Sequence, residues 1–126
     1  MKHKRPVNLD IATIRLPLTN IASFAHRISG MAIFFGTSVL LYILQISLSS
    51  AEGFDLALQM MERPLISLII WVILAAIVYH LIAGTKHLLL DLGLGETKNG
   101  AKIGAFVVVI LFLLSIPFLS ILLLWK

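Results

Sequence analysis

The chain has 126 residues, of which 60% are hydrophobic and 13% are charged. Its mean hydropathy of +1.04 is far above that of soluble globular domains, so the composition predicts a membrane protein. The lack of cysteine excludes disulfides, cysteine-ligated zinc, iron–sulfur ligation and covalent haem attachment within the chain. The net charge of +4 is explained by cations gathered at one membrane surface and calls for no nucleic acid.

The chain begins with a basic segment, residues 1–20. Here "RPVNLD" and "RLPLTN" each combine a proline with capping residues, which predicts an irregular or briefly helical cytoplasmic segment. We expect Thr19 or Asn20 to cap the helix that follows. A cleaved signal peptide is not predicted, because no apolar run with a small-residue cleavage site follows directly.

Three later stretches contain no Asp, Glu, Lys or Arg: residues 28–51, 64–85 and 103–125. Each exceeds the roughly 20 residues that a helix needs to cross the hydrocarbon of a bilayer. Polarity does not alternate with period two in them, so a membrane β-barrel is not predicted. We predict an all-α membrane protein, one membrane-anchor domain over residues 1–126, with transmembrane helices at about 21–50, 64–92 and 101–125.

Charges are distributed unevenly between the connecting segments. The first loop, residues 52–63, is acidic apart from Arg63, whereas the N-terminal segment and the second loop are rich in lysine and arginine. By the positive-inside rule, the N-terminus and the second loop face the cytoplasm. No mitochondrial presequence is evident, so the predicted location is a bacterial inner membrane, crossed several times.

Polar groups follow one side of the second span. At helical periodicity His80, Gly84, His87 and Asp91 fall within roughly 60° of one another and form a stripe. Polar groups inside a membrane helix usually face a cavity, a cofactor or a partner helix. Lys86 lies off this stripe near the cytoplasmic end, where it either extends to the headgroups or serves a site.

A second polar group lies at the start of the first span. Ser23, His26, Arg27 and Gly30 share one side of that helix, within roughly 100°. The first helix leaves the cytoplasm and the second returns to it, so both groups lie in the cytoplasmic half of the bilayer. The two polar stripes are therefore predicted to meet.

The residue types suggest particular ligands. A neutral imidazole ligates haem iron and burial favours that neutral form, so His80 is a candidate ligand, with Gly84 leaving room for a flat macrocycle. The alternative is a histidine that hydrogen-bonds a neighbouring helix. Three helices enclose little volume, so a bulky cofactor would need walls from a partner chain in a heteromeric bundle.

Other polar residues of the two stripes have ordinary alternatives as well. Arg27 offers a fork suited to a haem propionate or a quinone carbonyl, and Ser23 can donate one more hydrogen bond to the same molecule. Arg27 could equally be a cytoplasmic anchor. His87 and Asp91 could form a proton path or a hydrogen-bonded cap on the helix end.

Three segments together carry a resemblance to a known family. "RPVNLD", "TNIASFAHRISG" and "YHLIAGTKHLLLDLG" closely resemble the cytochrome b membrane anchor, the larger of the two anchors, of succinate dehydrogenase (respiratory complex II). The resemblance covers about residues 5–93. It implies haem b shared with a smaller anchor subunit, an iron–sulfur subunit and a flavoprotein subunit as further partners, membrane lipid around the bundle, and ubiquinone as substrate.

The resemblance also implies roles for single residues. His80 matches the axial haem ligand, Ser23 and Arg27 match the quinone-binding positions, and the second axial ligand is expected from the smaller anchor. The residues expected around the haem propionates or in the second shell are His26, Arg27 and His87. Asp91 matches a family position of less certain role, and Lys86 replaces an arginine that is common there, which would weaken a bidentate contact.

The implied function is electron transfer from succinate oxidation to quinone, through haem and quinone sites on this chain. No residue of the chain is expected to be catalytic toward succinate itself. One alternative is a fumarate reductase anchor, which runs the reaction in the opposite direction. A second is a noncatalytic assembly or transporter subunit, in which the histidines only pack.

Overall fold

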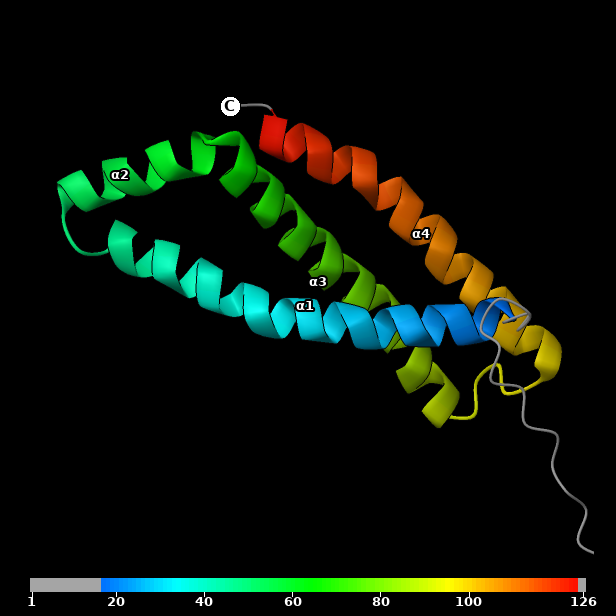
Figure 1. The fold of residues 1–126 in the computed structure, drawn as a ribbon. Helices are drawn as coiled ribbons and strands as arrows, with labels where there is room; N and C mark the ends of the chain where they lie inside the picture. Colours follow the sequence, from blue (N-terminus) through cyan, green and yellow to red (C-terminus); the bar gives the residue numbers. More distant parts are fainter. Residues whose placement is uncertain (1–16, 125–126) are drawn as a thin grey trace, which may run out of the picture.

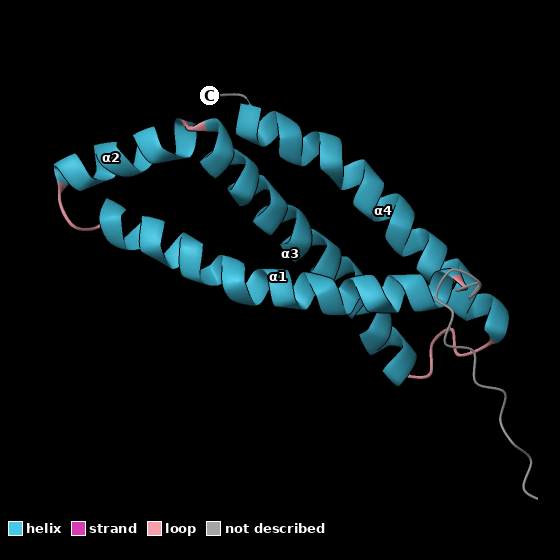
Figure 2. Ribbon diagram, in the orientation of Figure 1, coloured by secondary structure: helices cyan, strands magenta, loops and turns pink. Residues whose placement is uncertain are grey.

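The computed structural model describes residues 17–124, and these residues form helices and no strand. In chain order the helices are α1 (Leu18–Ser47), α2 (Ala51–Glu62), α3 (Pro64–Asp91) and α4 (Lys98–Leu124) (Figure 1, Figure 2). The predicted irregular segment lies almost wholly in residues 1–16, outside the described residues.

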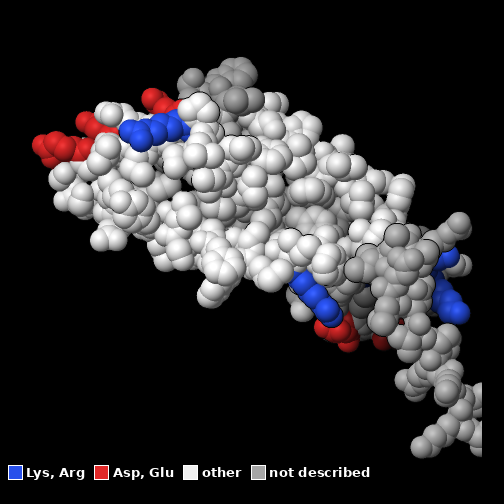
Figure 3. All heavy atoms as spheres, in the orientation of Figure 1, with Lys and Arg blue, Asp and Glu red and all other residues white. Residues whose placement is uncertain are grey.

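Three of the helices are long and apolar enough to span a membrane: Leu18–Ser47, Pro64–Asp91 and Lys98–Leu123. The all-α membrane fold and its three spans are therefore confirmed. On the face shown in Figure 3, charged side chains lie toward the two ends of the molecule and the surface between them carries none. Such an uncharged belt suits the hydrocarbon core of a bilayer, which rejects charge.

The start of the first span differs from the prediction. Pro17, with φ −64° and ψ 152°, is the N-cap, and no side chain caps the helix. The backbone amides of Asn20 and Ile21 both bond the Pro17 carbonyl oxygen, at 2.9 and 3.2 Å. The expected cap at Thr19 or Asn20 was therefore wrong, because proline presets the φ of a helix start and the helix begins before either residue.

The acidic first loop is in fact largely helical. Ser50 caps α2 by accepting a hydrogen bond from the Gly53 amide at 3.0 Å. Hydrogen bonds from its own backbone N–H and from the Ser50 hydroxyl hold the pKa of the Glu52 carboxyl below its usual range. Pro64 then ends α2 and starts α3, since the residue before a proline avoids the helical region.

The helices pack against one another in pairs and do not surround one large core. α3 lies between α1 and α4, and α2 folds back against α1 and the start of α3 (Figure 1). At the α2 end, Ile43, Ala57 and Ile70 form one buried cluster. At the other end, Tyr79, Ala83 and Val108 form a second, which supports the polar stripes of α1 and α3.

Close packing of α1 on α3 depends on Gly36. A Cβ atom at this buried position would lie 2.7 Å from Cγ1 of Ile73, closer than two carbons can approach. We expect Gly36→Val to destabilise the folded chain by about 1–3 kcal/mol through overpacking. Thermal unfolding of the purified complex in detergent measures this, with the neighbouring exposed Thr37→Val as control. An equal melting temperature for both variants would contradict the close contact.

Candidate functional site

Imidazole rings from two spans meet where α1 packs on α3. His26 of α1 stacks on His80 of α3, with ring centroids 4.0 Å apart and an interplanar angle of 15°. The His87 ring, two turns further along α3, lies 5.2 Å from that of His26 at 50°. The two predicted stripes therefore do meet, and the three histidines form one cluster.

Hydrogen bonds fix one nitrogen of His80. Its Nδ1 lies 3.0 Å from the Ser29 Oγ and 3.2 Å from the backbone oxygen of His26. The Ser29 hydroxyl donates its own proton to that same His26 oxygen, at 2.7 Å. Both partners of Nδ1 are thus acceptors, which in a neutral imidazole assigns the proton to Nδ1 and the lone pair to Nε2.

Ser29 was missed by the sequence analysis, although it lies inside the quoted "HRISG". It is polar yet only 6% exposed. A serine three residues after His26 can reach the His26 carbonyl within its own helix, a common local bond in membrane helices. The signal that could have found it is its position two residues beyond Arg27, on the side of α1 that turns toward α3.

Two glycines make room for the stacked rings. A Cβ on Gly30 would lie 3.2 Å from Cε1 of His80, and a Cβ on Gly84 would lie 3.3 Å from Nε2 of His26. From the sequence, Gly84 is predicted to leave room for a flat macrocycle. In the structure the His26 ring occupies it, because the glycines let α1 and α3 approach closely enough to trap the imidazole.

The Nε2 atom of His26 is buried against Gly84 and has no hydrogen-bond partner among the described residues. A buried polar nitrogen without a partner costs free energy, so it indicates a position where another polar group could bind. Because imidazole lone pairs lie in the ring plane, the stacked His26 and His80 cannot both direct a nitrogen at one ion. Within residues 17–124 no group of three or more His, Cys, Asp or Glu could hold a metal.

The remaining predicted residues lie around this cluster. Ser23 is half-buried and donates its hydroxyl proton to the Thr19 carbonyl at 3.0 Å, and Arg27 is exposed one turn further along α1. Asp91 is exposed at the end of α3, whose C-cap is Leu92. The Leu92 amide bonds carbonyl oxygens of the last turn, and the role of Asp91 as a proton path or a helix cap stays a prediction.

Lys86 points away from the histidines. A Cβ on Gly104 of α4 would lie 3.5 Å from its Cγ and 3.6 Å from its Cε, so the methylene stem of the lysine crosses α4 at that glycine. This contact agrees with the ordinary role of a lysine whose stem packs while its ammonium reaches for the membrane surface.

Tyr79 closes the inner side of the cluster. Its hydroxyl donates to the Ala22 carbonyl at 2.9 Å, and its ring packs edge-on against Phe112 with centroids 5.1 Å apart. This buried tyrosine thereby ties α3 to both α1 and α4 directly beside His80. The residue that precedes the predicted ligand thus holds its helix in place.

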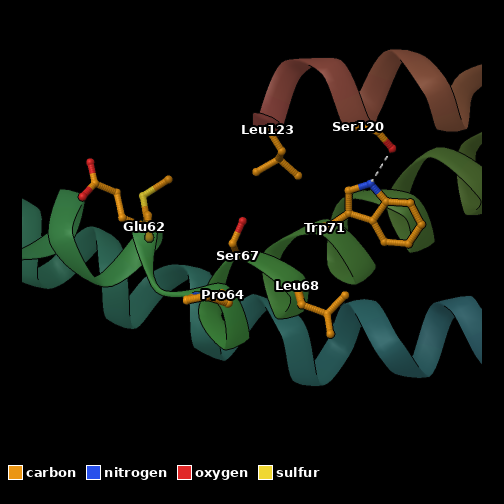
Figure 4. A pocket seen from close by; sticks show the side chains of 8 residues that line it. Glu62, Pro64, Ser67, Leu68, Trp71, Ser120 and Leu123 are labelled. Carbon is orange, nitrogen blue, oxygen red and sulfur yellow. Dashed lines mark hydrogen bonds between the residues drawn. The ribbon is translucent and has the colours of Figure 1, made fainter. Parts of the chain in front are cut away.

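A separate cavity lies away from the histidine cluster. It has a volume of about 650 Å³ and is formed where α2 meets α3, opposite the end of α4 (Figure 4). Trp71 lines it and donates from Nε1 to the Ser120 Oγ at 3.3 Å. Since Trp71 lies more than two turns before His80, this cavity does not belong to the histidine cluster.

The fold and the site define a multi-pass helical membrane subunit with an imidazole cluster between two of its spans. Residues 1–118 match the family described as succinate dehydrogenase/fumarate reductase transmembrane subunit. The chain belongs to this family, and within it to the cytochrome b anchor subunits of complex II. Bacterial relatives indicate the inner membrane as its location.

Curated relatives are named as cytochrome b subunits of succinate dehydrogenase. The succinate dehydrogenase cytochrome b556 subunit of Coxiella burnetii is 37% identical over 117 residues, which cover 92% of this chain and 94% of that protein. The subunits of the same name from Paracoccus denitrificans and Rickettsia felis are 33% and 29% identical, over 72% and 86% of this chain and 70% and 84% of those proteins. These relatives favour a succinate dehydrogenase subunit over the transporter alternative.

Proposed function

We propose that this chain binds haem b and ubiquinone and passes electrons from succinate oxidation to the quinone. The observation that carries the proposal is the hydrogen bonding of His80. Metal-binding histidines commonly donate the proton of one ring nitrogen to a carbonyl or another acceptor, which fixes the tautomer and orients the other nitrogen at the metal. The Ser29 and His26 oxygens do this for Nδ1 of His80.

The residues present fit a haem that is shared with another chain. Nε2 of His80 would hold the iron, and the unpartnered Nε2 of His26 would supply a polar contact for a propionate. Because the His26 ring stacks on His80, His26 would not hold the same iron, and we assign the second residue that would hold it to a smaller anchor subunit. When bound, haem b supplies a one-electron carrier beside the quinone site.

The quinone site is proposed at Ser23 and Arg27. They are one helical turn apart, so their side chains lie on neighbouring parts of the same side of α1. Arg27 is exposed and can donate to a quinone carbonyl oxygen, whereas the Ser23 hydroxyl must first rotate away from the Thr19 carbonyl. Both donors would stabilise the negative charge that the quinone oxygens gain during reduction.

Reduction of a quinone to a quinol takes two electrons and two protons. We assign electron delivery to iron–sulfur and flavoprotein subunits at the cytoplasmic surface. His87 beside His26, and Asp91 one turn further toward the end of α3, would supply protons along the helix to the same surface. The cytoplasmic position of this surface is part of the proposal and follows from the lysine and arginine distribution.

The orientation of the spans has a direct test. In intact cells, a membrane-impermeant maleimide should label Gln59→Cys in α2 and leave Lys98→Cys at the start of α4 unlabelled, because only α2 would face outward. The chain has no cysteine of its own, so each label reports one position. Labelling of Lys98→Cys alone would invert the orientation.

The function itself is tested by a difference spectrum of the complex purified through a tag on this chain. We expect sharp b-type bands on reduction with dithionite and again with succinate. A featureless spectrum from a complex that contains all its subunits would overturn the haem proposal. Fumarate reduction by a low-potential quinol, much faster than succinate oxidation by ubiquinone, would instead favour the fumarate reductase alternative.

Ser29 should tune the His80 ligand without replacing it. We expect Ser29→Ala to lower haem affinity by about 10–100-fold and to shift the haem midpoint potential, because His80 loses its closer hydrogen-bond partner. Ser29→Thr keeps the hydroxyl and should restore most of the affinity. Redox titration and haem content per complex measure both effects. A potential unchanged in Ser29→Ala would show that this bond does not act on the ligand.

A further inference from the structure

Helix α2 is fixed in orientation by its packing. Gly53 and Ala57, both buried, face the bundle, and a Cβ on Gly53 would overlap the Ile46 carbonyl oxygen. Residues 48–50 alone join α2 to α1, and Arg63 alone joins it to α3. The helix therefore cannot roll about its axis, and the sides it turns away from the bundle are set.

The side of α2 opposite Gly53 is acidic. At roughly 100° per residue, the polar side chains of the helix fall within about 80° of one another and directly away from the buried residues. All are exposed, and they are Glu52, Asp55, Gln59 and Glu62. The acidic side chains lie at the α2 end of the molecule in Figure 3. Since hydrocarbon rejects carboxylates, this side of the helix must face water.

Between the acidic and the buried sides lies an exposed apolar flank. Phe54 is 53% exposed and Leu58, one turn on, is 46% exposed. Leu48 and Leu65, just beyond the two ends of α2, are 76% and 67% exposed. Large apolar side chains are therefore exposed on this flank of α2 and also at the residues next to both of its ends.

We infer that α2 lies in the outer interface of the bilayer, across the end of the helix bundle, and that lipid covers the flank formed by Phe54 and Leu58. A helix with charge on one side and large apolar residues beside it takes this position because each side meets its own solvent. Lipid is favoured over a protein partner, because only residues 48–50 and Arg63 separate α2 from two membrane spans, which keeps its apolar flank close to the surface of the bilayer. This inference does not depend on haem or quinone binding.

The absence of cysteine from this chain permits a site-by-site test in the assembled complex. Single cysteines at Phe54, Leu58, Asp55 and Gln59 are spin-labelled in complexes reconstituted into phosphatidylcholine vesicles, with the labelled wild-type complex as background. Collision rates with oxygen, which concentrates in lipid, and with a water-soluble nickel chelate are then measured. We expect the oxygen-to-nickel ratio at Phe54 and Leu58 to exceed that at Asp55 and Gln59 several-fold.

Two other results would overturn the inference. Labels at Phe54 and Leu58 that are shielded from both oxygen and nickel would show that a protein subunit covers the flank. Nickel access at all four positions would show that α2 lies outside the membrane. None of the four positions is buried, so the cysteine substitutions leave the packed interior of the bundle unchanged. Copurification of the other subunits with each variant shows that the complex has assembled.

Discussion

Replacing His80 with alanine should abolish the b-type absorbance bands or displace them strongly, while the complex still assembles. The change deletes the imidazole whose Nδ1 is held by Ser29 and the His26 carbonyl, and with it the Nε2 lone pair proposed for the iron. A dithionite-reduced minus oxidised spectrum of the purified complex measures the bands. Succinate oxidation by an artificial acceptor, which needs no haem, shows that the other subunits are intact.

The matched control is Leu81→Ala. Leu81 is the next residue of α3 and is 64% exposed, so its truncation tests a smaller side chain at nearly the same depth. Its spectrum should equal that of the unmodified complex. If His80→Ala left the bands unchanged in an assembled complex, the ligand assignment would be wrong. Loss of the bands in His26→Ala with retention in His80→Ala would transfer the assignment to the stacked neighbour.

Hydropathy alone was sufficient to predict the three spans. A helix in hydrocarbon must form all its backbone hydrogen bonds within itself and must carry apolar side chains, so each span is an uninterrupted apolar run. Helical periodicity was sufficient to place His26, His80 and His87 together. A fixed rotation per residue turns spacing along the chain into direction, and two helices of opposite sense bring the two stripes to one depth.

The features that could not be predicted from the sequence depend on contacts between helices. In the sequence Ser29 does not differ from the other hydroxyl residues of the spans, because only the packing of α3 on α1 places it beside His80. Gly84 was predicted to leave room for a ligand, but the His26 ring occupies that space in the structure. The helical character of α2 was hidden because its twelve residues are too short and acidic to stand out by hydropathy, and its amphipathic pattern makes sense only beside a bundle.

Arg27→Leu should have the largest effect on quinone chemistry. Loss of a charged hydrogen-bond donor costs about 1.5–3 kcal/mol, which corresponds to roughly a ten- to hundredfold lower kcat/KM for ubiquinone. Ser23→Ala removes a neutral donor, worth about 0.5–1.5 kcal/mol, and should lower kcat/KM by roughly two- to tenfold. Succinate-dependent ubiquinone reduction measures both, and succinate oxidation by an artificial acceptor should stay unchanged.

Two further variants separate a donor from a mere positive charge. Arg27→Lys keeps the charge and loses the planar fork, so its activity should lie between those of the unmodified chain and Arg27→Leu if quinone orientation matters. Arg63→Leu removes an exposed arginine at the opposite end of the spans and should change nothing. Full activity in Arg27→Leu would mean that Arg27 serves only as a membrane anchor. Because Arg27 is exposed and outside the buried clusters, a loss of activity in an assembled complex would instead mean a lost contact with quinone or haem rather than a damaged fold.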